Sequence, residues 1–303
     1  MARTRLAPSP TGALHLGNAR TFALTWLWAR AHGHGLPLRM EDIDSPRKKS
    51  WAAEQALDDL RWIGIDWDGE PLVQSSRAAA HVSALEGLID AGAVYPCACT
   101  RKDVAEAQSA PHEDGRRYPG TCRDRFAGPE EAYASAGRPV AWRFQAPPGD
   151  VTFRDGLRGD TAVDPSMSGG DFVVARWCPD QGHQVGYQLA VVVDDAFQGV
   201  DVVIRGDDLL DSAARQILLQ RSLGLGSPEY VHVPLVVGED GRRLAKRHGD
   251  TKISSLRDAG SPARTVQEWI ASTSGFDVSA FDRPEACAFG WGMVPRERVV
   301  WPG

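Results

Sequence analysis

Residues 8–18, Pro-Ser-Pro-Thr-Gly-Ala-Leu-His-Leu-Gly-Asn, combine the residue types of an anion-binding turn. They stand between a short expected strand, Thr4 to Ala7, and a helical pattern that continues to about residue 32. The first backbone N–H groups of a helix are unpaired and lie at the positive end of the helix dipole, so they attract anions. Gly12 and Gly17 let a ligand approach the backbone closely, and His15 can donate a hydrogen bond to a phosphate oxygen. The stretch therefore predicts a phosphate-binding site.

A basic loop, Arg-Arg-Leu-Ala-Lys-Arg-His-Gly at residues 242–249, follows the expected last strand, Val231 to Val237. A basic run of this kind is usually only a solvated surface segment. Beside a phosphate-binding turn, Lys246 can instead neutralise the charge that develops on phosphate groups during a reaction. Together the two segments favour nucleotide chemistry.

Three of the five cysteines, Cys97, Cys99 and Cys122, lie close together in the sequence. Bunched cysteines in a chain without a secretory leader indicate a metal site more than disulfides, and a structural zinc site needs four ligands. No fourth cysteine is close, so His112 and Tyr118 are the candidates for the remaining ligand. The alternative is three reduced cysteines that bind no metal.

The spacing of apolar residues alternates between strands and helices over the first 94 residues, which predicts an α/β fold with a doubly wound parallel sheet. Leu36 to Met40 is an expected strand, and the apolar run Val185 to Asp195, which includes Tyr187, reads as a strand buried on both faces. Val200 to Arg205 is a further strand. Parallel strands end at one edge of a sheet, so Arg5, Glu41 and Arg205 are expected at that edge.

We expect a nucleotide-binding domain in two halves, separated by a polar stretch that is rich in Gly and Pro and has only short strand-like pieces. The expected divisions are residues 1–94 (first half), 95–178 (an inserted zinc-binding α+β subdomain), 179–240 (second half) and 241–303 (the basic loop and a short helical segment). Six basic residues crowd the insertion and could contact phosphates or simply be solvated; they are Arg101, Lys102, Arg116, Arg117, Arg123 and Arg125.

The chain has 303 residues and a net charge of −6, so any contact with nucleic acid must use local basic patches. It shows neither a charged-then-apolar leader nor an apolar run near the ~20 residues that a membrane span needs. We therefore expect a cytoplasmic protein, and we expect a monomer.

The pattern Pro-x-Pro-Thr-Gly-x-x-His-x-Gly-Asn resembles the first signature of class I aminoacyl-tRNA synthetases, and the Pro-Ser-Pro-Thr-Gly form resembles their glutamyl branch. The basic loop is similar to the second signature but departs from it at Ala245 and Arg247, where small hydroxyl residues are usual. The resemblance implies a Rossmann-like fold that holds ATP with Mg²⁺. The implied ATP-binding residues are His15, Gly17, Asn18 and Lys246.

The glutamyl resemblance also implies a site for L-glutamate. Its two carboxylates need cations and its ammonium group needs an anion. By resemblance, Glu41 takes the α-ammonium group, and the other pocket residues are Arg5, Ala7, Ser9, Tyr187 and Arg205. The Cys-x-Cys and Tyr-x-x-x-Cys pattern resembles the zinc site of one glutamyl-type subgroup, which implies that Tyr118, rather than His112, joins Cys97, Cys99 and Cys122 as the fourth ligand of one structural zinc ion.

The resemblance covers about residues 3–258 and stops where a full glutamyl-tRNA synthetase would continue into an anticodon-binding region. With the tyrosine-containing zinc pattern, this resembles the glutamyl-queuosine tRNA(Asp) synthetase family. That implies glutamate activation without prior tRNA and transfer to the queuosine base of tRNA(Asp). The alternatives are a truncated glutamyl-tRNA synthetase that charges a tRNA 3′ end, a non-catalytic RNA-binding paralogue, and another adenylyl-transferring enzyme that activates a small acid.

Overall fold

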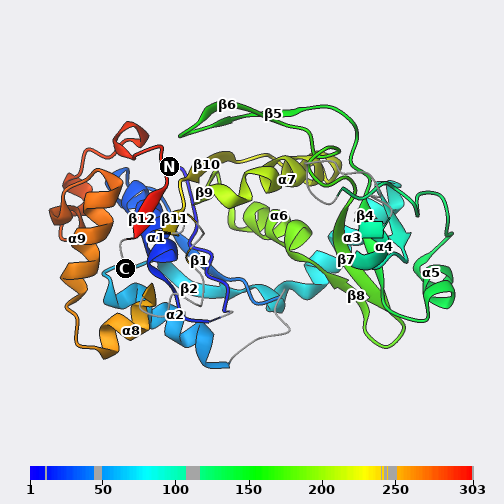
Figure 1. Ribbon diagram of the computed structural model, residues 1–303, viewed down its shortest axis with the longest axis horizontal. Coiled ribbons are helices and arrows are strands. Elements are labelled where there is room, and N and C mark those ends of the chain that lie inside the picture. Colours follow the sequence, from blue (N-terminus) through cyan, green and yellow to red (C-terminus); the bar gives the residue numbers. More distant parts are fainter. Residues whose placement is uncertain are drawn as a thin grey trace.

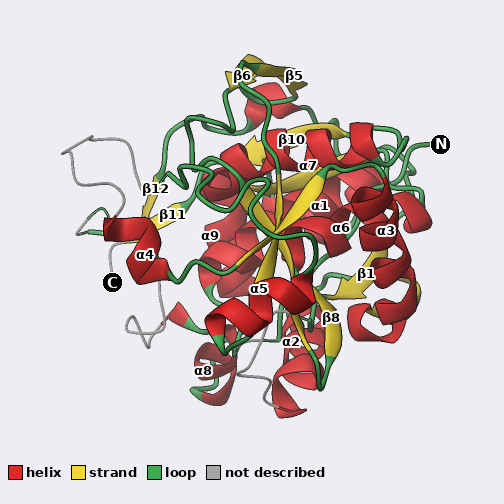
Figure 2. Cartoon of the chain, turned by 90° about the vertical axis from the view of Figure 1, so that its right-hand side faces the viewer, coloured by secondary structure: helices red, strands yellow, loops and turns green. Residues whose placement is uncertain are grey.

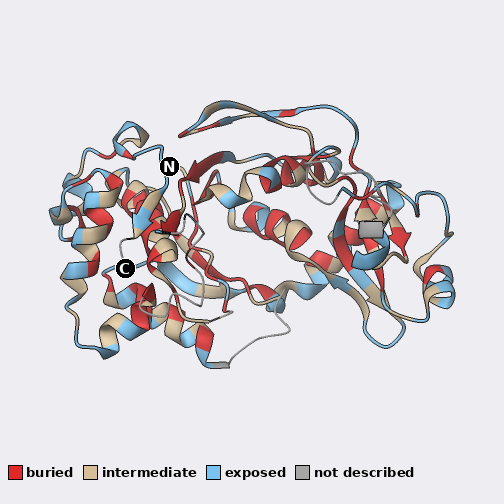
Figure 3. Cartoon of the chain, viewed as in Figure 1, coloured by how far each residue is buried: buried red, intermediate tan, exposed pale blue. Residues whose placement is uncertain are grey.

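The structure is a computed structural model that describes residues 1–10, 12–43, 50–106, 117–239, 241, 244 and 251–301. The molecule is elongated, with the first and last parts of the chain at one end and the middle of the chain at the other (Figure 1). Apolar side chains form two main buried clusters, one around α1 and β1 and the other around α6 and α7. Figure 3 shows buried segments running through both regions.

Parallel strands form the end of the molecule that carries both termini. The extended N-terminal segment pairs with β1 through parallel bridges at Arg3 and Leu6, and β1 pairs with β2. On its other side, the Arg3 carbonyl accepts hydrogen bonds from the N–H groups of Asp201 and Val202, which join it to the start of β9. β9 is parallel to β10. These strands are β1 (Pro37–Met40), β2 (Asp68–Val73), β9 (Val202–Gly206) and β10 (Glu229–Val233).

The helices divide between the two clusters. Those of the first cluster are α1 (Leu16–Ala31), α2 (Ser50–Trp62), α8 (Ile253–Asp258) and α9 (Ala263–Ser274). Those of the second are α3 (Ala78–Asp90), which follows a short 3-10 helix at Gln74–Arg77, α6 (Tyr187–Gln198) and α7 (Leu210–Ser222). The predicted helix to about residue 32 is confirmed to within a few residues, and the short helical segment expected after the basic loop is present as α8 and α9.

An antiparallel sheet forms the far end of the molecule. Its strands occur in the order β3 (Val94–Cys97), β4 (Val140–Phe144), β7 (Phe172–Cys178) and β8 (Gly182–Val185). The helix α5 (Pro129–Ala136) lies against it. The short helix α4 (Arg101–Glu106) begins with a capping box, because Thr100 and Asp103 each accept a hydrogen bond from the other's backbone N–H, at 3.0 and 2.6 Å.

A hairpin from the expected insertion joins the parallel strands. β5 (Val151–Asp155) and β6 (Gly159–Val163) are antiparallel, and β5 pairs in parallel with β10 where Asp155 lies beside Tyr230. The hairpin lies along the top of the molecule in both views (Figures 1 and 2). Residues 151–163 thus reach back to the parallel strands, whereas β3, β4 and β7 stay in the antiparallel sheet.

The prediction of a strand from Val185 to Asp195 is wrong, because most of this run forms the helix α6. Glycines bracket it: Gly186 is the N-cap, and Gly199 ends the helix in the left-handed conformation with a φ of 63°. The helix contacts α3, α7 and β7 and is buried on several sides, so its sequence has no polar stripe to mark a helical period. Tyr187 accordingly begins a helix and does not lie on a central strand.

Two smaller differences concern the end of the chain. The predicted strand Val231 to Val237 is interrupted at Pro234, which separates β10 from β11 (Val236–Gly238). Residues 241–303, expected to hold the basic loop and a short helical segment, also contribute β12 (Val299–Trp301), which pairs in parallel with β11.

Candidate active site and metal centre

Backbone hydrogen bonds bring Arg5 and Glu41 to the same edge of the parallel strands. The N–H of Arg39 donates to the Leu6 carbonyl at 2.8 Å, and the N–H of Glu41 donates to the Pro8 carbonyl at 2.9 Å. The N-terminal segment and β1 therefore stay in register to the end of β1. This pairing fixes both side chains on rigid backbone.

Four buried charges of mixed sign lie at this edge. Asp195, on α6, accepts from Arg5 Nε at 3.2 Å and from Arg39 Nη1 at 2.8 Å, and Glu41 accepts from Arg39 Nη2 at 2.9 Å. Burial works against the charge of Arg39, but Asp195 and Glu41 outweigh it and raise its pKa. Burial raises the pKa of Glu41, and Arg39 and Arg5 oppose that rise. The cluster is a pre-formed polar site inside an apolar surround.

Tyr187 lies within electrostatic range of the same charges. Burial raises the pKa of its hydroxyl, the negative charge of Glu41 adds to the rise, and Arg205 and Arg5 oppose it. The first turn of α6 thus carries a hydroxyl toward the region where Arg5, Glu41 and Arg205 meet. The structure brings these four predicted residues together.

Arg205 is held by neutral partners. Its Nη1 donates to Gln216 Oε1 at 2.8 Å, its Nη2 donates to the Leu209 carbonyl at 3.1 Å, and its Nε donates to His232 Nε2 at 3.1 Å. None of the carboxylates in the described part of the chain forms an ion pair with it. Three of the five N–H groups of the guanidinium are used, so the remaining two and an uncompensated charge suit a carboxylate ligand.

His15 and Gly17 shape the start of α1. His15 is the N-cap, and its Nδ1 accepts from the backbone N–H of Asn18 at 3.3 Å. In a neutral ring this leaves the proton on Nε2, which can donate to an anion. A side-chain carbon at Gly17 would lie 3.0 Å from the His15 ring, so the close approach of the ring favours glycine there.

The chain on the far side of the basic loop returns to this helix start. His15 pairs with Lys252 in an antiparallel bridge, and the N–H of Ile253 donates to the Leu14 carbonyl at 2.9 Å. Lys246, Ala245 and Arg247 lie outside the described residues. The segment that follows them is nevertheless anchored beside residues 14 and 15.

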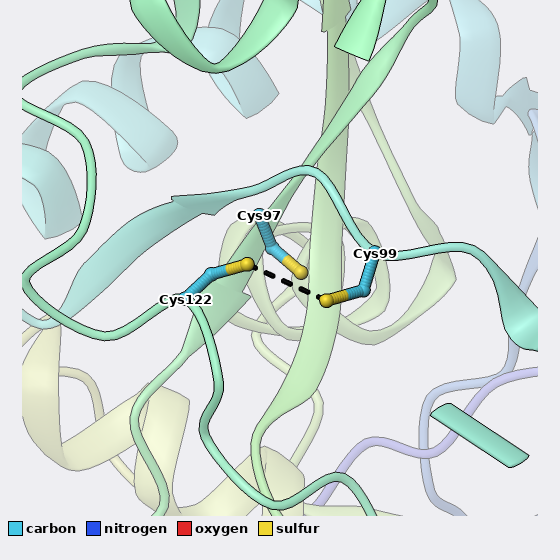
Figure 4. A group of neighbouring side chains, drawn as sticks. All are labelled: Cys97, Cys99 and Cys122. Carbon is cyan, nitrogen blue, oxygen red and sulfur yellow. Dashed lines mark hydrogen bonds between the residues drawn. The ribbon is translucent and has the colours of Figure 1, made fainter. Parts of the chain in front are cut away.

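The three sulfur atoms of Cys97, Cys99 and Cys122 lie within 4.8 Å of one another. Cys99 and Cys122 approach to 3.4 Å, and the three side chains point toward a common centre (Figure 4). Cys97 comes from the end of β3, and Cys99 and Cys122 come from the loops beyond it. Three converging sulfurs are a suitable donor set for zinc.

Tyr118 completes this group. Its hydroxyl oxygen is 3.3 Å from Cys97 Sγ and 3.7 Å from Cys99 Sγ, and it accepts from the Cys122 N–H at 3.0 Å. Bonds of about 2.0–2.3 Å in a tetrahedral zinc site place neighbouring donor atoms roughly 3.5–3.8 Å apart. The Arg143 guanidinium lies 3.8 Å from the centre of the Tyr118 ring, and its Nε donates to Cys97 Sγ at 3.2 Å. The residues present fit a four-coordinate zinc ion, with a cation beside its anionic ligands.

Residues 1–279 match the family described as tRNA synthetases class I (E and Q), catalytic domain. The chain belongs to this family. Because the match includes the start of α1, the glutamate-site candidates and the segment after the basic loop, the geometry above can be read as that of a synthetase catalytic domain.

Relatives of this synthetase carry two different names. The Glutamyl-Q tRNA(Asp) synthetase of Rhodopirellula baltica is 49% identical over 89% of this chain and 84% of its own length. The Glutamate–tRNA ligase of Synechococcus sp. (strain RCC307) is 41% identical over 89% of this chain and 58% of its own length. The crystal structure of the glutamate-tRNA synthetase from Elizabethkingia anophelis superposes with a TM-score of 0.82 at 24% identity, over 100% of this chain and 68% of that one, which shows the shared fold.

Other predicted residues have varied positions. Ala7 is half-buried and Ser9 is exposed, both directly after the N-terminal segment. Arg123 forms two hydrogen bonds to the buried Asp171, at 2.5 and 2.7 Å, so this exposed cation is paired with a carboxylate of the protein and is not merely solvated. His112 and Arg116 lie outside the described residues. No helix in the described part of the synthetase is long and apolar enough to span a bilayer.

Sequence reasoning missed four polar residues at the site: Arg39, Asp195, His232 and Asp155. Asp195 had a usable signal, because residues 187, 191 and 195 share one helical face once α6 is read as a helix. His232 and Asp155 had none, because their partners come from distant segments.

Proposed function

We propose that this synthetase activates L-glutamate with ATP without prior tRNA and transfers the glutamyl group to the queuosine base in the anticodon loop of tRNA(Asp). In the first step a carboxylate oxygen of glutamate attacks the α-phosphorus of ATP, and the bond to the β-phosphate oxygen breaks to release pyrophosphate. In the second step a nucleophilic group of queuosine attacks the carbonyl carbon, AMP leaves and the nucleophile loses its proton. The enzyme is a ligase.

The charge pattern at the strand edge supports glutamate as the amino acid. Arg205 offers an uncompensated guanidinium to one carboxylate, and Glu41, whose charge is supported by its ion pair with Arg39, offers an anion to the α-ammonium group. Arg5 and Tyr187 complete the site, and Ala7 and Ser9 line it. Arg39 and Asp195 hold Glu41 and Arg5 in place through the buried ion pairs. The observation that carries the proposal is this convergence of Arg5, Glu41, Tyr187 and Arg205.

The start of α1 is the proposed ATP cradle. Its N-terminal N–H groups, with His15, Gly17 and Asn18, hold the phosphates, and Mg²⁺ accompanies ATP as co-substrate. Lys246 neutralises the pyrophosphate as it leaves. The pairing of His15 with Lys252 supports this role, because it anchors the end of the basic loop beside the cradle.

We assign one structural zinc ion to Cys97, Cys99, Tyr118 and Cys122. When bound, the ion cross-links β3 to the loop that carries Tyr118 and Cys122. We also propose that residues 1–94 and 179–240 form a Rossmann-like nucleotide-binding domain, with residues 95–178 as the zinc-containing insertion and residues 241–303 as the basic loop and C-terminal segment. The synthetase acts as a monomer.

The first experiment measures exchange of labelled pyrophosphate into ATP in the absence of tRNA. We expect exchange with glutamate and little with aspartate, glutamine or small organic acids. Exchange with a different acid, and none with glutamate, would point to another adenylyl-transferring activity. No exchange with any acid would favour a non-catalytic RNA-binding paralogue.

The second experiment identifies the acceptor. A tRNA(Asp) anticodon stem-loop that carries queuosine should accept labelled glutamate, and the same stem-loop with guanine at that position is the matched control. This acceptor is favoured by the greater identity to the Rhodopirellula baltica protein named Glutamyl-Q tRNA(Asp) synthetase.

A glutamate–tRNA ligase activity is the second candidate, supported by the 41% identity to the Synechococcus protein. It uses the same pocket for glutamate and ATP. Full-length tRNA(Glu) and the queuosine stem-loop should therefore be compared in parallel. This candidate would be favoured if tRNA(Glu) accepts labelled glutamate and the same tRNA, with its 3′ end oxidised by periodate beforehand, does not.

A further inference from the structure

A buried chain of hydrogen bonds leads from β5 to Arg205. Asp155 Oδ2 lies 2.7 Å from His232 Nδ1, and His232 Nε2 lies 3.1 Å from Arg205 Nε. Asp155 is 1% exposed and His232 is fully buried. The three residues belong to β5, β10 and β9, so three neighbouring strands contribute one residue each.

The chemistry of Arg205 fixes the direction of every hydrogen bond in this chain. A guanidinium group only donates, so His232 Nε2 must accept and must carry no proton. A neutral imidazole then has its proton on Nδ1, where it donates to Asp155. Burial lowers the pKa of His232, which agrees with a neutral ring. Burial opposes the charge of Asp155, but the hydrogen bonds from His232 and the backbone outweigh it and lower the pKa of this carboxyl.

The Asp155 carboxylate is fully used by these contacts. Its Oδ1 accepts from the N–H groups of Leu157 and Arg158, at 3.0 and 2.9 Å, and its Oδ2 accepts from the N–H and Nδ1 of His232. An amide in its place would direct an NH₂ group at two donors, whichever way it turned. Only an ionised carboxylate satisfies all four donors.

We propose that Asp155 and His232 are positioning residues that orient the Arg205 guanidinium toward the carboxylate of the amino-acid substrate. On the other side of Arg205, Gln216 accepts from Nη1, and Gln216 Nε2 donates to Gln188 Oε1 at 3.1 Å. Gln188 follows Tyr187 in the first turn of α6, so Arg205 is connected through Gln216 to the start of the helix that carries Tyr187. The inference rests on the proposed function, because it assigns Arg205 to the substrate.

Through this series of hydrogen bonds, the hairpin β5–β6 helps to position Arg205. Asp155 is the last residue of β5, and the next turn carries Arg158, which pairs with Asp207 at 2.6 Å, two residues after Arg205. The hairpin therefore holds the Arg205 strand end at two places. A segment that sequence analysis assigned to the insertion orients a residue of the amino-acid site.

Two substitutions separate the two hydrogen bonds of His232. His232→Asn can keep a donor to Asp155 but has no group that reaches Arg205, whereas His232→Gln can place its carbonyl oxygen near Arg205 Nε. Val231→Ala is the control for lost packing. Val231 lies on the same strand as His232, but its side chain packs in the apolar cluster around α1 and β1. Pyrophosphate exchange gives the KM for glutamate and for ATP in each variant.

We expect His232→Asn to raise the KM for glutamate about tenfold or more and to change the KM for ATP less than about twofold. His232→Gln should recover most of this loss. Equal glutamate KM values in wild type and His232→Asn, or equal rises in the KM for glutamate and ATP, would overturn the inference. If the wild type catalyses glutamate-dependent exchange and the variants have the same KM values as the wild type, this inference alone is wrong. If the wild type catalyses no glutamate-dependent exchange, the proposed function is wrong.

A measurement on the wild type does not depend on how the variants fold. Nitrogen NMR of the imidazole rings should show His232 with a protonated Nδ1 and an unprotonated Nε2 at neutral pH. The ring can be assigned by its proximity to Tyr230, whose ring centre is 6.0 Å away. A proton on Nε2, or on both nitrogens, would contradict the proposed orientation of Arg205.

Discussion

Arg39 and Asp195 form an ion pair of 2.8 Å in which the arginine side chain is completely buried. Arg39 belongs to β1 and Asp195 to α6, so this contact joins the two halves of the proposed nucleotide-binding domain across the intervening residues. Asp195 also pairs with Arg5, and Arg39 also pairs with Glu41. The position of the predicted ligands Arg5 and Glu41 therefore depends on two residues that do not themselves belong to the predicted ligand set.

Asp195→Asn should destabilise the protein strongly. The substitution leaves Arg5 and Arg39 without their shared anion, and removal of one partner from a buried pair costs about 3–5 kcal/mol. Urea unfolding should show this decrease in the free energy of unfolding. Asp58→Asn is the matched control, because the pair of Asp58 with Arg61 is exposed and should contribute less than about 1 kcal/mol. Similar effects of both substitutions would show that the buried pair is unimportant.

Glu41→Gln should weaken glutamate binding while it leaves ATP binding nearly unchanged. The amide keeps the size of the side chain but removes the negative charge proposed for the α-ammonium group. Loss of a charged hydrogen bond in a buried site should raise the KM for glutamate about 10- to 100-fold. Pyrophosphate exchange at varied glutamate and at varied ATP separates the two constants. A rise confined to the KM for ATP would mean that Glu41 contributes to the ATP site and not to the glutamate site.

The common position of the candidate residues could be predicted where they lie on or directly after an expected strand and match a local pattern, as with Arg5, Glu41 and Arg205. Tyr187 was found by resemblance, although its element was wrong. An apolar run of 11 residues fits a strand buried on both faces as well as a helix buried on several sides, and only Gly186 and Gly199 favour the helix. Local patterns therefore indicated which candidate residues lie close together better than they indicated the elements that carry them.

The supporting contacts were beyond such patterns. Asp155 and His232 are 77 residues apart, and nothing near either position indicates its partner. The pairing of β5 with β10 depends on how the whole hairpin packs against the parallel strands. Tertiary packing of this kind leaves no local pattern in the sequence. The cysteine cluster was predictable for the opposite reason, because Cys97 and Cys99 are almost adjacent and Cys122 follows Cys99 by only 23 residues.

Asp59 should make stability depend on pH. This carboxylate is buried on α2, 3.1 Å from Arg257 of α8, and burial raises its pKa from 3.8 to about 6 although Arg257 opposes the rise. The folded state thus binds the proton more tightly than the unfolded state. Ionisation of Asp59 therefore lowers the free energy of unfolding as the pH rises from about 4 through 6, and the loss approaches about 3 kcal/mol once Asp59 is fully ionised in both states.

The variant Asp59→Asn isolates this contribution, because all other titrating groups are common to both proteins. Its free energy of unfolding relative to wild type should increase by about 2 kcal/mol between pH 4 and pH 7. Chemical denaturation at several pH values measures the difference. A constant difference across this range would mean that Asp59 titrates normally in the folded protein.

The cysteine cluster should bind about one zinc ion per chain, since four donors satisfy a structural site. Cys97→Ser should lose the metal, whereas Cys178→Ser, outside the cluster, should retain it. Tyr118→Phe removes only the hydroxyl oxygen and should weaken zinc binding at least about tenfold in competition with a chelator. Tyr133→Phe is the control for loss of a tyrosine hydroxyl elsewhere. Full zinc content and unchanged affinity in Tyr118→Phe would leave the fourth position to another ligand.

Lys246→Ala tests the basic loop at the step where phosphate charge develops. If Lys246 stabilises the departing pyrophosphate, its removal should lower the rate of glutamate-dependent exchange by about 100-fold or more, because the lost interaction exists mainly in the transition state. The KM for glutamate should change little, since Lys246 is not assigned to that pocket. Lys246→Arg keeps the charge with a different shape and should retain more activity than the alanine variant. Equal exchange rates for the wild type and both variants would exclude a role for this lysine in activation. They would favour the alternative that the basic loop is a solvated surface segment.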